Sequence, residues 1–219
     1  MFKKKIKKIL SRKSGDKKGK GQSLVEFALT LPILLMLLSG LVEFGFMLND
    51  YLSIVDASRE AARSVSNAGH DETFEGGVTF YQLTTSRVVD ALEPADSLDT
   101  TRKVAIRGNR INCSTEDQET GVCDNEIIVS VYGIDDTSAS LIESHHWVDT
   151  DPRQVSRFTA EEINNRLTGA TKVYAGVVVV EVFYNYEQVL GLPWMAMLPD
   201  PVLLHSYTIM PLSSAEPEN

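Results

Sequence analysis

The chain has 219 residues, a formal net charge of −9 and 43% hydrophobic residues. This length allows one domain of ordinary size plus a membrane anchor. The charge is unevenly divided, because residues 1–21 carry nine lysines, Arg12 and one acid, Asp16, and so sum to +9, which leaves −18 on the remainder. A body this acidic would repel phosphate, which argues against nucleic-acid binding. The basic N-terminal segment, residues 1–21, indicates instead a sequence that orients a membrane helix.

A long apolar segment follows the basic N-terminal segment. Residues 27–42 carry no charge, and residues 24–48 carry only Glu26 and Glu43. As a helix, residues 24–48 would measure about 37 Å, against a hydrocarbon core of roughly 30 Å. A cleaved signal peptide fits less well, because its apolar region is roughly 7–15 residues and ends in a small-x-small site. We therefore expect a single-pass protein of the cytoplasmic (inner) membrane, with the N-terminus inside and the acidic body exported.

Several residues of this segment could serve helix packing. The charge-free stretch rises about 24 Å, so Glu26 and Glu43 are expected near the two edges of the bilayer. Either could reach the headgroup region, and Glu43 is then either an interfacial charge or a packing residue. Pro32 predicts a kink, because it lacks an N–H and clashes with the preceding turn. Gly40 and Gly45 leave small surfaces that favour close helix packing.

The start of the apolar segment resembles a processing site. Gly21, the residues QSLV, then Glu26 and Phe27 resemble the cleavage site of type IVb prepilins and of TadE-like pilus assembly proteins. The stretches VEFALTLPILL, GLVEFG and DASREAAR resemble the same TadE-like family. The resemblance covers residues 21–68, about a fifth of the chain. A further glycine that the family pattern has near residues 61–62 is absent.

The resemblance implies a cut between Gly21 and Gln22 by a prepilin peptidase, which would remove the basic leader, residues 1–21. The new ammonium on Gln22 would lie one helical turn from Glu26 and on the same face, so the two charges could neutralise each other within or between subunits. The implied partners are the peptidase, other major and minor pilins, inner-membrane pilus platform proteins and membrane lipid.

The implied function is that of a minor pilin or pseudopilin in the assembly of a tight-adherence (Flp, type IVb) pilus through helix packing. Such a protein would be embedded in the inner membrane or incorporated in a surface pilus. The alternative is an unprocessed bitopic membrane protein whose exported domain senses or binds something.

The expected fold is α+β and pilin-like, with a long N-terminal helix that continues into a globular head containing an antiparallel sheet. The helix is expected over residues 22–69, with a stop at Asn67, Ala68 and Gly69. Its expected inner face is formed by Leu48, Leu52, Val55, Ala62 and Val65. The head, residues 70–210, is predicted to hold helices at 78–92 and 159–167 and strands at 103–112, 126–134, 171–186 and 202–210. Residues 211–219 are expected to be a flexible tail.

Two head elements carry sharper expectations. In the predicted strand 171–186, one face is wholly apolar and the other carries Glu181 and Asn185. We therefore expect a central antiparallel strand that is packed on one side. In the predicted helix 159–167, Thr159 and Glu162 have the spacing of a capping box.

Cys113 and Cys123 flank an acidic loop, residues 114–122. In an exported domain this spacing predicts a disulfide across a hairpin end. A metal site would need more ligands of the right type nearby, and the acids of the loop lack the ordered spacing of a calcium-binding loop.

The candidates for catalysis are His145 and His146 with Asp149 and Asp151. Adjacent histidines on one strand point to opposite faces, and the sequence holds no HExxH or GxSxG pattern. We therefore expect no enzyme activity, no cofactor and no metal, and we place the histidines in an exposed loop. A pocket with one of these histidines turned inward would favour a membrane-anchored enzyme instead.

Overall fold

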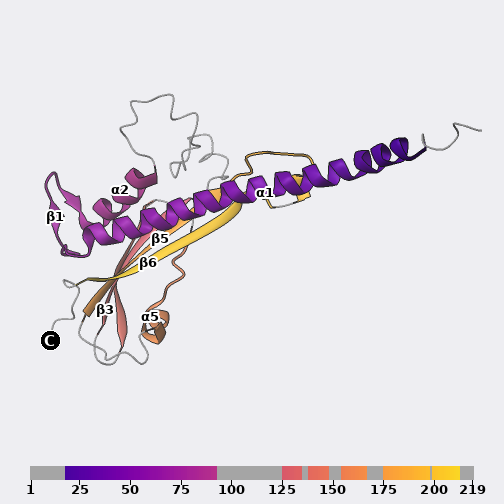
Figure 1. Cartoon of the computed structure of the whole chain (residues 1–219). Helices are drawn as coiled ribbons and strands as arrows, with labels where there is room; N and C mark the ends of the chain where they lie inside the picture. The colour runs from indigo at the N-terminus through magenta and orange to yellow at the C-terminus, as the bar shows by residue number, and fades with distance from the viewer. Residues whose placement is uncertain are drawn as a thin grey trace, which may run out of the picture. The chain divides into compact units, whose positions relative to one another are not determined.

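The structure is a computed structural model that describes residues 18–92, 125–134, 138–147, 154–166, 175–197 and 199–212. The described chain divides into two compact units. The first contains residues 18–45 and 189–197, and the second contains the rest. Figure 1 shows the elements in chain order.

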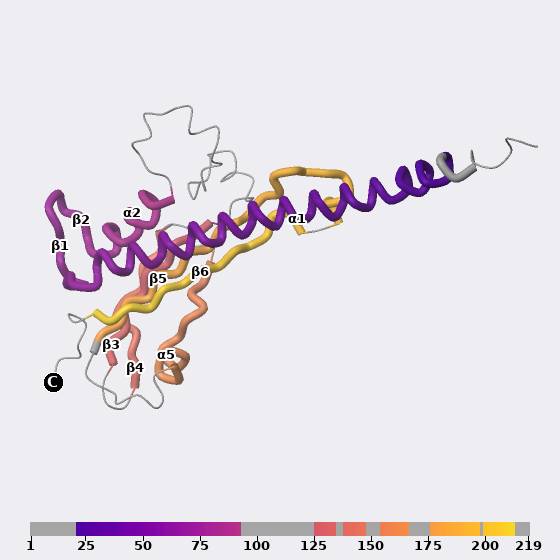
Figure 2. Tube along the Cα trace, viewed as in Figure 1, coloured from indigo at the N-terminus to yellow at the C-terminus, as the bar shows by residue number. Residues whose placement is uncertain are grey.

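The first unit consists of the N-terminal part of helix α1, Lys18–Val65, and of a nonhelical segment that ends in the short 3-10 helix η1, Met195–Met197. Helix α1 runs through Pro32 as one element of 48 residues. Figure 2 shows it as one continuous helix. Among the described residues it is the one helix long and apolar enough to cross a membrane, with a mean hydropathy of 2.2 in its most apolar window. The residues of that window are not buried within the structure. Their exposed apolar side chains therefore indicate contact with lipid or with another helix.

The second unit is built on a four-stranded antiparallel sheet with the order β4-β3-β5-β6. Its strands are β3, Glu126–Ile134; β4, Ala139–His146; β5, Ala175–Tyr186; and β6, Val202–Leu212. The α+β fold class is confirmed, and β3 has the bounds that the sequence predicts. Strand β6 continues past the expected end at Met210 to Leu212, which is buried. The predicted strand 103–112 lies outside the described residues.

One face of this sheet is covered by the C-terminal part of α1 and by α2, Phe80–Leu92 (Figure 1). Small residues of α1, namely Ala57, Ala61 and Ala62, are buried in this core and let the helix lie close to the strands. Ser58 is also buried, and its hydroxyl lies 3.0 Å from the Thr208 hydroxyl of β6. Hydroxyls that pair in this way satisfy each other away from water.

The predicted inner face of α1 is wrong at its start. Leu48 and Leu52 are 43% and 53% exposed, whereas Ile54 and the small residues after it are buried. Ala62 and Val65, the later members of the predicted face, are buried, so the prediction holds where α1 lies over the core of the second unit. Helix α1 ends at Val65, and the predicted stop at residues 67–69 lies in the turn that comes next.

The opposite face of the sheet packs against α5, Ala160–Arg166, and the segment before it. Phe158 and Ile163 join Tyr132, Val177 and Val179 in a second buried cluster. Strand β5 is therefore central and antiparallel, as predicted, but it is buried on both faces and not on one. Glu181 and Asn185 suggested that one face of β5 is solvated. The valines of that face, Val177 and Val179, are instead buried in the second cluster.

Helix α2 begins two residues later than predicted. Val78 and Thr79 form strand β2, which pairs with β1, Thr73–Phe74, across a turn in which Gly76 and Gly77 have φ of 88° and 79°. Such positive φ values favour glycine. The Thr79 hydroxyl accepts the Gln82 N–H at 3.3 Å, and the Gln82 side chain accepts the Thr79 N–H at 3.1 Å. This reciprocal cap starts the helix at Phe80.

Candidate functional site

The predicted processing segment lies in the first turns of α1, and its side chains are exposed from Gly21 to Phe27. The Gln22 side-chain amide donates to the Glu26 carboxylate at 3.0 Å. The turn between these residues thus brings position 22 to the carboxylate, as the spacing predicts. Cleavage at Gly21 stays a prediction.

The glycines of the apolar helix are not required by the described fold. A Cβ placed at Gly21, Gly40 or Gly45 would meet nothing within 4 Å. None of the three has a positive φ. If glycine is needed at these positions, the reason lies in something that contacts the helix from outside.

A shallow apolar hollow of about 260 Å³ lies on α1 near Pro32. It is lined by Phe27, Thr30, Leu31, Ile33, Leu34 and Leu37. The Thr30 hydroxyl donates to the Phe27 carbonyl at 3.1 Å, which keeps that polar group within the helix. The predicted kink at Pro32 stays a prediction, while the hollow offers a place for an apolar side chain of a neighbouring helix.

Glu43 is not a free interfacial charge. It is 6% exposed, and its two carboxylate oxygens accept the backbone N–H groups of Val189 at 2.6 Å and of Leu190 at 3.0 Å. These amides begin the apolar loop, defined here as residues 189–197, which lies beside α1 within the first unit (Figure 2). A carboxylate that accepts two amide donors makes charge-assisted hydrogen bonds, which are shorter and stronger than neutral ones.

A second contact ties the apolar loop to α1 one turn earlier. The Trp194 indole N–H donates to the Ser39 hydroxyl at 3.0 Å. Met195 is buried, and its backbone N–H donates to the Leu192 carbonyl at 2.8 Å. The loop is thus fixed to Ser39 and Glu43, which share one face of the helix at a spacing of four residues. The sequence gives no signal for this pairing, because its partners are about 150 residues apart.

Glu181 forms a second buried carboxylate site, in the second unit. It is fully buried on β5 and accepts the Arg157 backbone N–H at 3.0 Å and the Ser156 hydroxyl. His205 of β6 places Nε2 at 3.1 Å from the same carboxylate and stacks on Phe183. With no exposed surface, this group has no access to a substrate, and it serves to hold the segment before α5 against the sheet.

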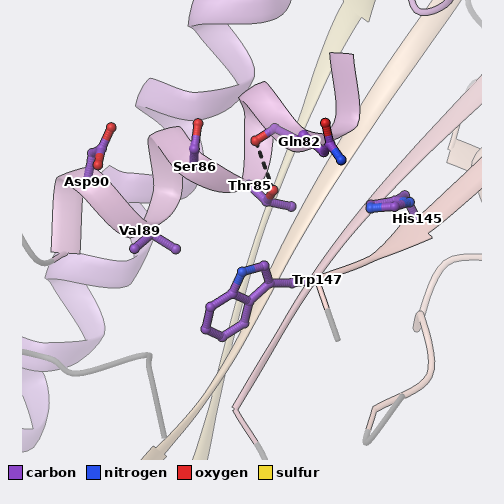
Figure 3. A pocket seen from close by; sticks show the side chains of 7 residues that line it. All are labelled: Gln82, Thr85, Ser86, Val89, Asp90, His145 and Trp147. Atoms are coloured by element: carbon purple, nitrogen blue, oxygen red, sulfur yellow. Dashed lines mark hydrogen bonds between the residues drawn. The ribbon is translucent and has the colours of Figure 1, made fainter. Parts of the chain in front are cut away.

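A polar pocket of about 390 Å³ lies between α2 and the end of β4 (Figure 3). It is lined by Gln82, Thr85, Ser86, Val89, Asp90, His145 and Trp147. Figure 3 shows the His145 ring beside this pocket, and that ring lies 5.6 Å from the Tyr81 ring. Burial, followed by the nearby Glu143 carboxylate, raises the pKa of Tyr81, so this phenol stays protonated.

The predicted catalytic candidates are only partly brought together. His145 and His146 lie on strand β4, opposite Val129 and Ile128, and are half-buried, so their placement in an exposed loop is wrong. The polar composition of β4 concealed an edge strand. Asp149 and Asp151 lie outside the described residues, as do Cys113 and Cys123 with the disulfide predicted for them. Within the ranges that the structure describes, no group of three or more His, Cys, Asp or Glu residues is placed to bind a metal ion.

Comparison with known families gives one match. Residues 21–63 match a family described as TadE-like protein, which confirms the resemblance that the sequence predicts. The match begins at Gly21 and covers nearly all of α1 from that residue onward. No curated protein and no solved structure matches the chain with significance. The TadE-like match suggests a pilin-like protein associated with a Tad pilus, and the apolar helix fits a single-pass membrane protein.

Proposed function

We propose that this chain is a TadE-like minor pilin or pseudopilin, which acts in the assembly of a tight-adherence (Flp, type IVb) pilus. The observation that carries the proposal is the family match over residues 21–63, which begins at the predicted cleavage site and continues along an apolar helix. In this proposal the helix sits in the inner membrane with its N-terminus in the cytoplasm, because the +9 leader precedes it. The acidic head is then exported.

A prepilin peptidase cuts between Gly21 and Gln22 in this proposal. The open space around Gly21 supports it, since the described fold gives no reason for a glycine there. Cleavage would replace the leader by an ammonium on Gln22, one turn from Glu26, where the Gln22 side chain already lies 3.0 Å from the carboxylate. Loss of nine net positive charges also removes what holds the helix end in the cytoplasm.

Assembly proceeds by helix packing against other pilins and the inner-membrane platform. The exposed apolar surface of α1, the hollow near Pro32, and the open surfaces at Gly40 and Gly45 support this role. Small residues let membrane helices approach closely. No residue of the chain acts as a catalyst in this role.

The alternative function is an unprocessed bitopic protein whose exported domain binds something. The polar pocket beside His145 and Trp147 favours it, because it is a place where a small polar ligand could sit. Since His145 lines this pocket, the pocket is also the feature expected of a membrane-anchored enzyme. The two functions differ in their dependence on Gly21, which the binding protein does not need.

The test uses two matched glycine variants in a host that has a prepilin peptidase. Gly21→Leu and Gly40→Leu both add a side chain where the fold has open space. We expect Gly21→Leu to keep the full-length mass in the membrane fraction and to lose surface pili. The Gly40→Leu control should be shortened like the parent chain. Full-length parent chain in every host, or shortening of Gly21→Leu at the parental site, would contradict the proposal.

A further inference from the structure

We propose that the apolar loop is a second membrane-contacting element, which places Trp194 and Met197 in the lipid interface beside α1. This interface lies at the C-terminal end of the charge-free stretch, where Val42 is followed by Glu43. This inference rests on the proposed function in one respect, that α1 spans a bilayer.

The contacts of the loop set its depth. Val189 and Leu190 bind Glu43, and Trp194 binds Ser39. Four residues of helix correspond to about 6 Å along the axis. The loop therefore descends by about one turn from Leu190 to Trp194, into the level of the charge-free residues 27–42. With those residues in hydrocarbon, Trp194 lies at the membrane edge, where tryptophan is enriched in membrane proteins.

The composition of the loop suits lipid better than water. Residues 189–197 are VLGLPWMAM and carry no charge, and the nearest charges on either side are Glu187 and Asp200. Met197 is 91% exposed and Trp194 is 40% exposed. Removing apolar surface from water is worth roughly 25 cal/mol per Å². Contact with lipid would therefore stabilise side chains that the first unit leaves uncovered.

The backbone N–H groups at the start of the loop and at Met195 have partners within the protein, which they would need in lipid because water is absent there. Nonhelical backbone is tolerated at membrane depth only where its polar groups find partners. The Glu43 carboxylate accepts the N–H groups of Val189 and Leu190, and the Leu192 carbonyl accepts the N–H of Met195. Pro193 has no backbone N–H group that needs a partner. This arrangement gives Glu43 a function at the membrane edge, because its carboxylate accepts the backbone N–H groups at the start of a loop that enters lipid.

Lipid is the environment that best fits the exposed side of the apolar loop, because this side continues the exposed apolar surface of α1. Leu37, Leu38 and Leu41 of α1 lie at the same level as Ser39 and are 69%, 54% and 67% exposed. The loop thus adds to a surface that already faces outward from the helix at this depth. As a consequence, extraction of the subunit from the membrane must remove the loop from lipid together with α1.

The experiment uses the full chain in phosphatidylcholine vesicles, with lipids brominated either near the headgroups or near the acyl chain ends. Bromine quenches tryptophan fluorescence at short range, and the chain has two tryptophans. Trp147→Phe leaves Trp194 as the probe. Trp194→Phe leaves Trp147, which packs beside the core of the second unit, as a matched control. A third protein lacks both tryptophans and carries Leu35→Trp, in the middle of the charge-free stretch.

We expect Trp194 to show blue-shifted emission and loss of intensity with the shallow bromines, Leu35→Trp to respond most to the deep ones, and Trp147 to respond to neither. An unquenched Trp194 together with a quenched Leu35→Trp would overturn the loop proposal and leave the membrane helix intact. That result would mean that protein or water covers the loop. If no probe is quenched, α1 is not in the bilayer, and the membrane part of the proposed function fails as well.

Discussion

Replacing Glu43 tests the attachment of the apolar loop to α1. The carboxylate accepts two backbone N–H groups, at 2.6 Å and 3.0 Å, and has little contact with solvent. Hydrogen bonds to charged groups contribute about 1.5–3 kcal/mol each. Glu43→Gln keeps one acceptor oxygen and loses the charge, so we expect the loop attachment to weaken by about 1.5–3 kcal/mol. Glu43→Ala removes both acceptors and should weaken it further.

Hydrogen exchange of the Val189 and Leu190 amides measures this directly, because local opening exposes them without unfolding the rest. Since 1.4 kcal/mol is a factor of ten, Glu43→Gln should speed their exchange by about 10–100-fold. The Glu26→Gln control changes an exposed carboxylate elsewhere on the helix and should leave these amides unchanged. Parental protection of both amides in Glu43→Ala would refute the reasoning.

Two further predictions concern the second unit and can be followed by urea unfolding in detergent. Glu181→Gln should cost about 1–2 kcal/mol, and Glu181→Leu about 3 kcal/mol or more, because leucine leaves both the Arg157 N–H and the Ser156 hydroxyl without their acceptor. Equal stability of the two variants would contradict this. Burial, followed by the charge of Glu181, raises the pKa of Tyr132. The folded state therefore holds the Tyr132 proton more tightly than the unfolded chain, and stability should be full below about pH 10 and fall above it. Tyr132→Phe loses the hydrogen bond to the Phe158 carbonyl and should be less stable at neutral pH, but it should lose less stability above pH 10; an alkaline loss as large as the parent's would oppose this assignment.

Local patterns predicted much of the fold. The short, nearly continuous apolar run EIIVSVYGI, rich in β-branched residues, predicts β3 with both of its ends, because composition and flanking residues are local signals. In the predicted capping box, the Thr159 hydroxyl accepts the Glu162 N–H at 3.2 Å. The Glu162 carboxylate instead pairs with Arg166 at 3.1 Å, one turn along the same helix. Such elements depend on neighbours in the chain, so they can be predicted without tertiary information.

The missed features depend on partners distant in the chain. Glu181 looked like a solvated residue because nothing nearby shows that Ser156 and His205 will surround it. The placement of Glu43 under the apolar loop depends in the same way on residues more than a hundred positions later. The sequence therefore shows where Glu43 and Glu181 stand in their elements, but their burial and their hydrogen-bond partners depend on the tertiary structure.

The processing segment was predicted in the opposite way, from resemblance and spacing. Its residues lie on an exposed turn, and the fold adds only that Gly21 is free of packing and that position 22 reaches Glu26. The chemistry proposed for this segment requires an enzyme and neighbouring subunits, which act on the chain from outside.

The most direct test of the proposed function is the N-terminal sequence of the protein extracted from membranes, in hosts with and without a prepilin peptidase. We predict a chain that starts at Gln22 only when the peptidase is present, which would give Glu26 an ammonium partner one turn away. A start at residue 1 in both hosts would contradict cleavage. The lysines would then be a permanent anchor, and the bitopic binding protein would be the better account.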